Sequence, residues 1–130
     1  MISLLIPAFN EEDSIKSTIE NAKLLFKNLK IKNFEIIVIN DGSTDKTGEY
    51  AKKTGVKIIT HPQNLGYGFS LKNGIRNARY ETIIITDADH TYPLSEVPNL
   101  YTEYKKGFDM VVGKRIGYRE SIIKTILRKI

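Results

Sequence analysis

The sequence contains no cysteine, and this absence removes several classes of chemistry at once. A disulfide framework, a thiolate metal site, an iron–sulfur cluster and a cysteine nucleophile are all excluded. No apolar run approaches the roughly 20 residues that a membrane-spanning helix needs. The opening residues 1–7 lack the basic flank of a signal peptide and are better explained as a buried strand.

The composition is that of one globular domain of ordinary size. The 130 residues are 41% hydrophobic and 27% charged, which excludes a disordered chain. The net charge is +5, but residues 1–100 hold 12 basic and 12 acidic side chains. The whole excess therefore lies in residues 101–130, which hold 8 basic and 3 acidic side chains. Because the first hundred residues are neutral, we expect no nucleic-acid partner.

Short apolar runs alternate with helical patterns along the chain. Two of the runs, Ile36–Ile39 and Ile83–Ile85, are continuous and β-branched, which is typical of parallel strands covered on both faces. The predicted strands are Ile2–Ile6, Phe34–Ile39, Val56–Ile59, Thr82–Thr86 and Phe108–Val112. The predicted helices are one with Ile15, Ile19, Ala22, Phe26 and Leu29 on a single face, then Asp45–Thr54, Tyr67–Ala78 and Leu94–Lys105. This order predicts an α/β fold with an open, mostly parallel sheet and helices on both faces.

The segment Arg119–Ile130 predicts a further helix that is amphipathic and basic. Its apolar side chains fall on one stripe, and Lys124, Arg128 and Lys129 lie off that stripe. Such a helix lies on an anionic membrane surface with its apolar stripe down, or it packs against the sheet. The sequence leaves both alternatives open.

A polar, acidic or glycine-bearing turn follows every predicted strand. These turns are residues 7–11, 40–45, 61–68, 87–89 and 113–115. Ligands of open α/β sheets bind beyond the carboxyl ends of the strands, which is where such turns meet. We therefore expect one binding site assembled from five separate loops.

Asp87 and Asp89 carry the most specific chemistry of these turns. Two residues apart on an extended segment, their side chains point the same way, and neighbouring carboxylates repel one another unless a cation or donors neutralise them. A hard cation such as Mg²⁺ or Mn²⁺ binds one or two carboxylates together with water and phosphate oxygens. The pair predicts a metal shared with a diphosphate, and the alternative is a helix cap with a turn aspartate. The adjacent His90 is either another ligand or a turn cap.

Asp41 ends the most hydrophobic predicted strand and is predicted to accept hydrogen bonds from a base or a ribose. Ser43 or Thr44 is predicted to cap the following helix, and Asp45 to interact with its dipole. His61, at the end of the next strand, is predicted to be a surface histidine.

The remaining turns suggest weaker contacts. Pro7 and Phe9 would flank a base and Glu11 would accept from it, or the turn is a plain strand-to-helix connection. Arg115 would meet a diphosphate, or it belongs to a solvated basic turn. The glycines of the segment 64–74 are predicted to let the backbone pass close to a ligand or a neighbouring helix.

Taken together, these motifs resemble the family-2 glycosyltransferases with the GT-A fold, in particular the dolichyl- and polyprenyl-phosphate sugar synthases. The motifs are Pro7-Ala8-Phe9-Asn10-Glu11, Asn40-Asp41-Gly42-Ser43-Thr44-Asp45, Asn64-Leu65-Gly66-Tyr67-Gly68 with Gly74, Asp87-Ala88-Asp89-His90-Thr91-Tyr92-Pro93 and Val112-Gly113-Lys114-Arg115. Catalytic domains of this family continue past the last motif. The resemblance therefore covers the donor half of a GT-A domain and lacks the usual C-terminal acceptor-side part.

The resemblance implies a nucleotide-sugar-binding domain over residues 1–118 and a separate basic helix over residues 119–130. It implies contacts to the nucleotide-sugar by Pro7, Phe9, Glu11, Ile39, Asp41, Asp87, Ala88, Asp89 and Arg115. Asp87 and Asp89 would bind Mg²⁺ or Mn²⁺, and Asp89 and Arg115 would be the catalytic residues.

The predicted function is inverting, metal-dependent transfer of a sugar from a UDP- or GDP-linked donor to an acceptor, and a polyprenyl or dolichyl phosphate is the expected acceptor. The alternative is a truncated, catalytically silent domain that binds the nucleotide-sugar. We expect a cytoplasmic location with a peripheral contact at the inner face of the membrane. A homo-oligomer or a C-terminal partner is an open alternative for the missing acceptor side.

Overall fold

The computed structural model describes residues 1–114, and the chain divides into two compact units between Ser95 and Glu96. The strands of the first unit are β1 (Ile2–Ala8), β2 (Phe34–Asn40), β3 (Lys57–Thr60) and β4 (Thr82–Ile85). Its helices are α1 (Ile15–Asn28), α2 (Thr47–Lys53) and α3 (Tyr67–Asn77). One 3-10 turn, Leu94–Glu96, precedes helix α4 (Val97–Tyr104), which belongs to the second unit.

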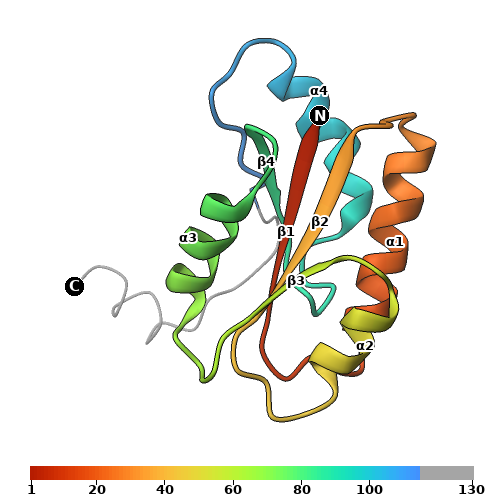
Figure 1. The fold of residues 1–130 in the computed structure, drawn as a ribbon. Coiled ribbons are helices and arrows are strands. Elements are labelled where there is room, and N and C mark those ends of the chain that lie inside the picture. Colours follow the sequence, from red (N-terminus) through yellow and green to blue (C-terminus); the bar gives the residue numbers. More distant parts are fainter. Residues whose placement is uncertain (115–130) are drawn as a thin grey trace, which may run out of the picture. The chain divides into compact units, whose positions relative to one another are not determined.

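The four strands form a parallel sheet in the order β3-β2-β1-β4. Helices α1 and α2 lie on one side of this sheet and α3 on the other (Figure 1). The chain runs outward from β1 through β2 to β3 and then crosses back to place β4 on the other side of β1. The predicted α/β architecture is confirmed, and the strand order reverses between β1 and β4.

The core lies around β1, β2 and the inner face of α1. All seven residues of β1 are buried, and Leu5, Ile37 and Ile39 form a fully buried cluster. Of the residues that the helical spacing predicted for one face, Ile15, Ile19, Ala22 and Phe26 are fully buried, and Leu29 is half-buried at the C-cap of α1. Burying side chains at steps of three and four is what an amphipathic helix on a sheet requires.

Strand β4 is less covered than its sequence predicts. Its residues Thr82–Ile85 are only partly buried, and Ile85 is 44% exposed. In the described residues β4 is an edge strand that pairs only with β1. The side chains of a strand are covered by helices on the two faces of the sheet. Helices α2 and α3 pack on β1, β2 and β3, so the prediction of two covered faces was wrong for β4.

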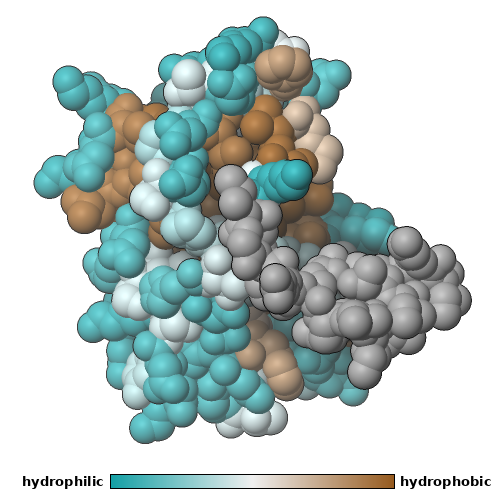
Figure 2. Space-filling model, turned by 180° about the vertical axis from the view of Figure 1, so that it is seen from behind, coloured by the Kyte–Doolittle hydropathy of each residue, from teal (hydrophilic) through white to brown (hydrophobic). Residues whose placement is uncertain are grey.

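The predicted fifth strand, Phe108–Val112, is not a strand in the structure. Phe108, Met110 and Val112 are 57%, 77% and 69% exposed. Strand propensity needs a neighbouring ladder to be realised, and the four-stranded sheet of the described residues includes no partner for this segment. On the face of the molecule that is turned away in Figure 1, hydrophobic residues are exposed at the surface between hydrophilic ones (Figure 2).

Three predictions fall outside the described residues. Arg115 and the basic helix over residues 119–130 both lie there, as does the predicted boundary at residue 118. Within residues 1–114, no helix combines the length and apolar character needed to cross a membrane.

Candidate functional site

A cavity of about 320 Å³ opens at the carboxyl ends of the strands. It is lined by Pro7, Ala8, Phe9, Glu11, Asp41, Asn64, Tyr67, Ser70, Asp87, Ala88 and Asp89. These residues come from the end of β1, from the loops after β1, β2, β3 and β4, and from helix α3. The cavity thus lies where the strand order reverses, which is where ligands of open α/β sheets bind.

The loop after β1 is held by the loop after β2. Asn10 has a left-handed backbone with φ of 52°, and its backbone N–H donates to Ser43 Oγ at 3.0 Å. Its Oδ1 accepts from the Thr44 N–H at 2.9 Å. Asn tolerates this backbone region better than most residues, and these bonds fix the position of the adjacent Phe9 and Glu11.

A second set of bonds joins the same loops one turn further on. The Glu11 N–H donates to Thr47 Oγ1 at 2.8 Å, and the Glu12 N–H donates to Asp45 Oδ2 at 3.2 Å. Asp45 Oδ1 also accepts from the Thr47 N–H at 2.9 Å. The residue before α2 is Lys46, without a side-chain cap, so the predicted caps Ser43 and Thr44 were wrong. Those side chains bond to Asn10 instead.

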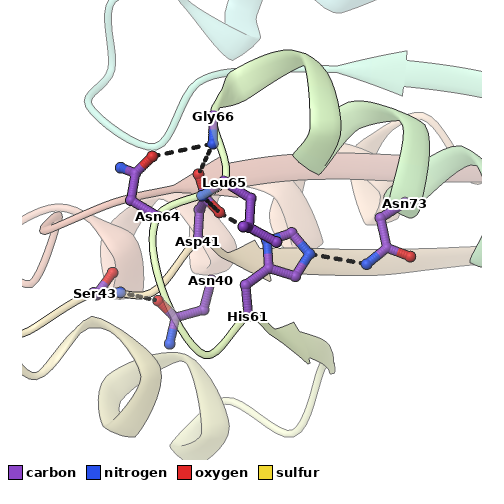
Figure 3. Close-up of polar contacts among 8 residues, drawn as sticks. All are labelled: Asn40, Asp41, Ser43, His61, Asn64, Leu65, Gly66 and Asn73. Carbon is purple, nitrogen blue, oxygen red and sulfur yellow. Dashed lines mark hydrogen bonds and ion pairs between the residues drawn. The ribbon is translucent and has the colours of Figure 1, made fainter.

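Asp41 is the most buried carboxylate in the cavity wall, with only 4% of its surface exposed. Its Oδ1 accepts from His61 Nδ1 at 2.7 Å and from the Leu65 N–H at 2.9 Å. Its Oδ2 accepts from the Gly66 N–H at 2.9 Å (Figure 3). Burial by itself raises the pKa of the Asp41 carboxyl, but these three hydrogen bonds outweigh it and hold the pKa below its usual value.

The histidine that supports Asp41 is buried, so its prediction as a surface residue was wrong. His61 is 5% exposed, and its Nε2 faces Asn73 Nδ2 of helix α3 at 2.9 Å. The Phe69 ring stands edge-on to the imidazole, with 5.3 Å between ring centroids. The sequence contains no local signal of this burial, because the partners lie 12 and 20 residues away in the chain.

Two glycines let the walls of the cavity approach one another. Gly42 has φ of 72°, and a Cβ there would lie 2.2 Å from the backbone carbonyl carbon of Gln63. Gly74 lets α3 approach the sheet, because a Cβ there would lie 2.9 Å from Ile39 Cδ1. The close approach predicted for the glycine-bearing segment is therefore found at Gly74, where the neighbour is a strand.

Asp87 and Asp89 both line the cavity after β4. Asp89 Oδ1 accepts hydrogen bonds from the N–H and the hydroxyl of Thr91, and these bonds lower the pKa of the Asp89 carboxyl. Burial and the negative charge of Asp87 raise the pKa of the Tyr67 hydroxyl, and a hydrogen bond with Asp87 acts in the same direction. Because it accepts both bonds from Thr91, Asp89 is a turn aspartate, which was the alternative to a metal ligand, and it also borders the cavity.

Asp87 and Asp89 place two carboxylates at the border of one cavity. Among residues 1–114, no group of three or more His, Cys, Asp or Glu side chains is arranged to hold a metal ion. Mg²⁺ does not need such a group, since it is commonly bound through one or two carboxylates and completes its shell with water and phosphate oxygens. Asp89 Oδ1 accepts from Thr91. Asp87 borders the same cavity as Asp89.

His90 turns away to helix α1. Its backbone is left-handed with φ of 62°, and its Nε2 lies 2.9 Å from Ser17 Oγ. Thr18 of the same helix donates through its hydroxyl to the Ala88 carbonyl at 2.9 Å. These bonds tie the loop after β4 to α1, so the His90 side chain contacts helix α1 and neither lines the cavity nor forms the predicted turn cap.

Glu11 lies close to several aspartates. Burial, followed by the charges of Asp89, Asp45 and Asp87, raises the pKa of its carboxyl despite a hydrogen bond from Ser14. Neighbouring carboxylates raise each other's cost of ionisation, and a cation in the cavity would relieve it.

The structure brings most of the predicted site residues together. Pro7, Phe9, Glu11, Asp41, Asp87, Ala88 and Asp89 all line the cavity. Ile39 does not line it, since this residue is fully buried in the core beneath it. The sequence reasoning did not identify Tyr67 and Ser70 as lining residues. Their spacing of three on a predicted helix that starts at the glycine-bearing loop was the available signal.

The family of this chain is shown by comparison with known proteins. The family described as "Glycosyl transferase family 2" matches residues 3–129. A dolichyl-phosphate beta-glucosyltransferase of Trichomonas vaginalis is 32% identical over 99% of this chain and 44% of its own length. A dolichol-phosphate mannosyltransferase of Pyrococcus furiosus is 31% identical over 88% of this chain and 33% of its own length.

Solved structures agree with this result. Glucosyl-3-phosphoglycerate synthase from Mycobacterium tuberculosis, in complex with Mn²⁺, uridine diphosphate and phosphoglyceric acid, superposes with a TM-score of 0.66. It is 29% identical, over 80% of this chain and 38% of that one. The chain thus spans less than half the length of these relatives. With a family match over nearly its whole length and a shared fold, the chain belongs to glycosyl transferase family 2.

Proposed function

We propose that this chain binds a nucleotide-diphospho-sugar in the cavity at the sheet edge and is the donor-binding part of an inverting glycosyltransferase. The observation that carries the proposal is the convergence of Asp41, Asp87 and Asp89 on one cavity at the switch point of the sheet. The volume of about 320 Å³ lies at the lower end of the range of small-molecule sites, about 300–1,000 Å³.

The nucleoside would occupy the buried end of the cavity. There Asp41 is 4% exposed, ionised and held by three hydrogen bonds, so it can accept a further bond from a base N–H or a ribose hydroxyl. Pro7 and the half-exposed ring of Phe9 would flank the base. An anionic diphosphate would avoid this end, because the Asp41 carboxylate repels it.

The diphosphate would lie at the more open end, where Asp89 is exposed. Asp87 and Asp89 would hold Mg²⁺ or Mn²⁺, which when bound neutralises charge on the departing nucleoside diphosphate. Relatives support this assignment, since one structural neighbour is described in complex with Mn²⁺ and another with Mg²⁺, each together with uridine diphosphate. Arg115, outside the described residues, would add positive charge at the same phosphates.

A polyprenyl phosphate is the proposed acceptor. Within residues 1–114, four carboxylates line the cavity, Glu11, Asp41, Asp87 and Asp89, and we assign each of them to the nucleotide or the metal. A hydroxyl acceptor needs a general base, whereas a phosphate is already anionic near neutral pH. The names of the relatives that act on dolichyl and undecaprenyl phosphates support this choice. The proposed setting is the cytoplasmic face of a membrane.

Calorimetric titration of UDP- and GDP-sugars with and without Mn²⁺ tests the donor and the metal together. The wild-type chain is expected to bind one of the donors at least 10-fold more tightly with Mn²⁺. Asp89→Asn keeps an oxygen that accepts from Thr91 but removes the charge, so it is expected to abolish most of this metal-dependent gain. Asp13→Asn removes an exposed carboxylate outside the cavity and is the matched control.

Each outcome distinguishes a different part of the proposal. Binding that does not depend on Mn²⁺ and is unchanged in Asp89→Asn would remove the metal assignment. Absence of nucleotide-sugar binding by the wild type would remove the donor proposal itself. Binding without formation of a glycosylated polyprenyl phosphate would favour the alternative, a domain that binds the donor but does not transfer the sugar.

A further inference from the structure

A chain of hydrogen bonds leads from the surface of α3 to the cavity wall. It runs from Asn77 through Asn73 and His61 to Asp41, and its last two members are 5% and 4% exposed (Figure 3 shows the chain from Asn73 to Asp41). Every link is between 2.7 and 3.0 Å long. Such a buried chain is informative because each group in it can be assigned as donor or acceptor.

The donor and the acceptor of each hydrogen bond in this series can be assigned from its outer end, at Asn77. Asn77 Nδ2 donates to the backbone carbonyl of Asn73 at 2.9 Å, and a carbonyl can only accept. The same nitrogen lies 3.0 Å from Asn73 Oδ1, so the side-chain oxygen of Asn73 faces outward. Its amide nitrogen must then face His61, where it donates to Nε2.

The inner end gives the same answer independently. A carboxylate can only accept, so His61 Nδ1, which lies 2.7 Å from Asp41 Oδ1, must carry the ring proton and donate it. Asp41 accepts at that oxygen and also from the N–H groups of Leu65 and Gly66. A carboxylate offers about four acceptor sites, so one site remains, on Oδ2. In the described residues Asp41 can therefore accept one more hydrogen bond and donate none.

We propose that His61 is a positioning residue for nucleotide recognition: held as the Nδ1–H tautomer by Asn73, it fixes the Asp41 carboxylate so that Oδ2 presents a single acceptor to the nucleoside. This inference rests on the proposed donor binding. The group that meets Oδ2 is a hydrogen-bond donor, a base N–H or a ribose hydroxyl. His61 itself does not touch the ligand, since it is not among the residues that line the cavity.

The first test concerns the chain alone and needs no nucleotide. Nitrogen NMR of the imidazole in the wild-type chain is expected to show the Nδ1–H tautomer. Asn73→Asp replaces the donor to Nε2 by an acceptor and is expected to move the ring to the imidazolium form. Asn28→Asp, at the exposed end of α1, introduces the same charge elsewhere and is the control. An Nε2–H tautomer in the wild type would overturn the inference.

The second test measures uridine and guanosine diphosphate affinity in two His61 variants. His61→Ala removes the donor to Asp41 and is expected to weaken binding about 10-fold, the effect of one hydrogen bond to a charged group. His61→Asn retains an N–H close to the position of Nδ1 and is expected to restore affinity to within about 3-fold of wild type.

A purely structural role would give a different pattern. If both variants lower the melting temperature but bind the nucleotide as the wild type does, His61 only packs and the inference fails. If the wild type binds neither nucleotide while the tautomer is as expected, the proposed function fails and with it the positioning role. Nucleotide binding by the wild type with the wrong tautomer overturns the inference alone.

Discussion

Two fully buried serines of this chain differ in their hydrogen bonding. Ser3 in β1 donates to Glu35 Oε1 at 2.6 Å and accepts from the Tyr80 N–H at 3.1 Å. Ser70 in α3 has a buried hydroxyl with no hydrogen-bond partner among the described residues. A satisfied buried hydroxyl contributes to stability, whereas an unsatisfied one costs about 1–3 kcal/mol.

Alanine substitutions of the two serines are therefore expected to have opposite effects. Ser3→Ala should lower the free energy of unfolding by about 1–3 kcal/mol, because the Tyr80 N–H loses its acceptor and Glu35 Oε1 keeps only its bond from the Arg79 N–H. Ser70→Ala should leave it unchanged or raise it by about 1 kcal/mol. Urea denaturation measures both values. Equal losses in the two variants would mean that the Ser70 hydroxyl has a partner after all.

At the scale of elements, contacts between the loops that follow β1, β2 and β3 build the cavity wall. The loop after β1 is joined to the loop after β2 through Asn10 and Glu12, and the loop after β2 meets the loop after β3 at Gly42. Side-chain bonds and a close backbone approach thus assemble three loops into one cavity wall. A substitution that displaces one of these loops is therefore expected to displace the other two.

Gly42→Ala tests this assembly. The new Cβ would lie 2.2 Å from a backbone carbon of Gln63, and φ at this position is 72°. We expect a loss of about 2–4 kcal/mol in the free energy of unfolding, from overpacking together with backbone strain. Gly55→Ala is the control, since φ there is 78° but no atom lies within 4 Å of the added Cβ. It should cost only about 1–2 kcal/mol, and a similar loss in both variants would contradict the close approach.

At the scale of the whole molecule, the carboxylates couple folding to pH. Burial raises the pKa of the Asp41, Asp45 and Asp89 carboxyls, but hydrogen bonds outweigh it and hold each pKa below its usual value. A group whose pKa is lower in the folded state stabilises the fold above its unfolded pKa of about 3.9, and this contribution is lost as the pH falls through the folded pKa. Glu11 has the opposite sign, because its pKa is raised in the folded chain.

We therefore expect the free energy of unfolding to fall as the pH drops from about 5 toward 2. Asp41→Asn should be less stable than wild type at pH 7 but should lose less stability on acidification, because its contribution is already absent. Asp13→Asn, with an exposed side chain, is the control and should follow the wild-type curve. Urea unfolding at several pH values measures the slopes, and parallel slopes for Asp41→Asn and wild type would contradict the role of its hydrogen bonds.

The sequence by itself determined the order and type of most elements. The spacing from Ile15 to Phe26 places α1 on the core, and the apolar run of β2 is buried as its composition predicts. Both signals are local, because each depends only on residues within one element. The cavity residues Asp41, Asp87 and Asp89 were predicted for a related reason: they directly follow strands, and parallel strands end at one edge.

Only the tertiary structure decided the properties that depend on distant partners. The burial of His61 depends on Asp41 and Asn73, and the exposure of β4 depends on its place at the edge of the sheet. The run Phe108–Val112 has strand propensity, but propensity forms no strand without a ladder to join. Hydrogen bonds and strand neighbours are formed between segments far apart in the chain, so the pattern within one segment cannot specify them.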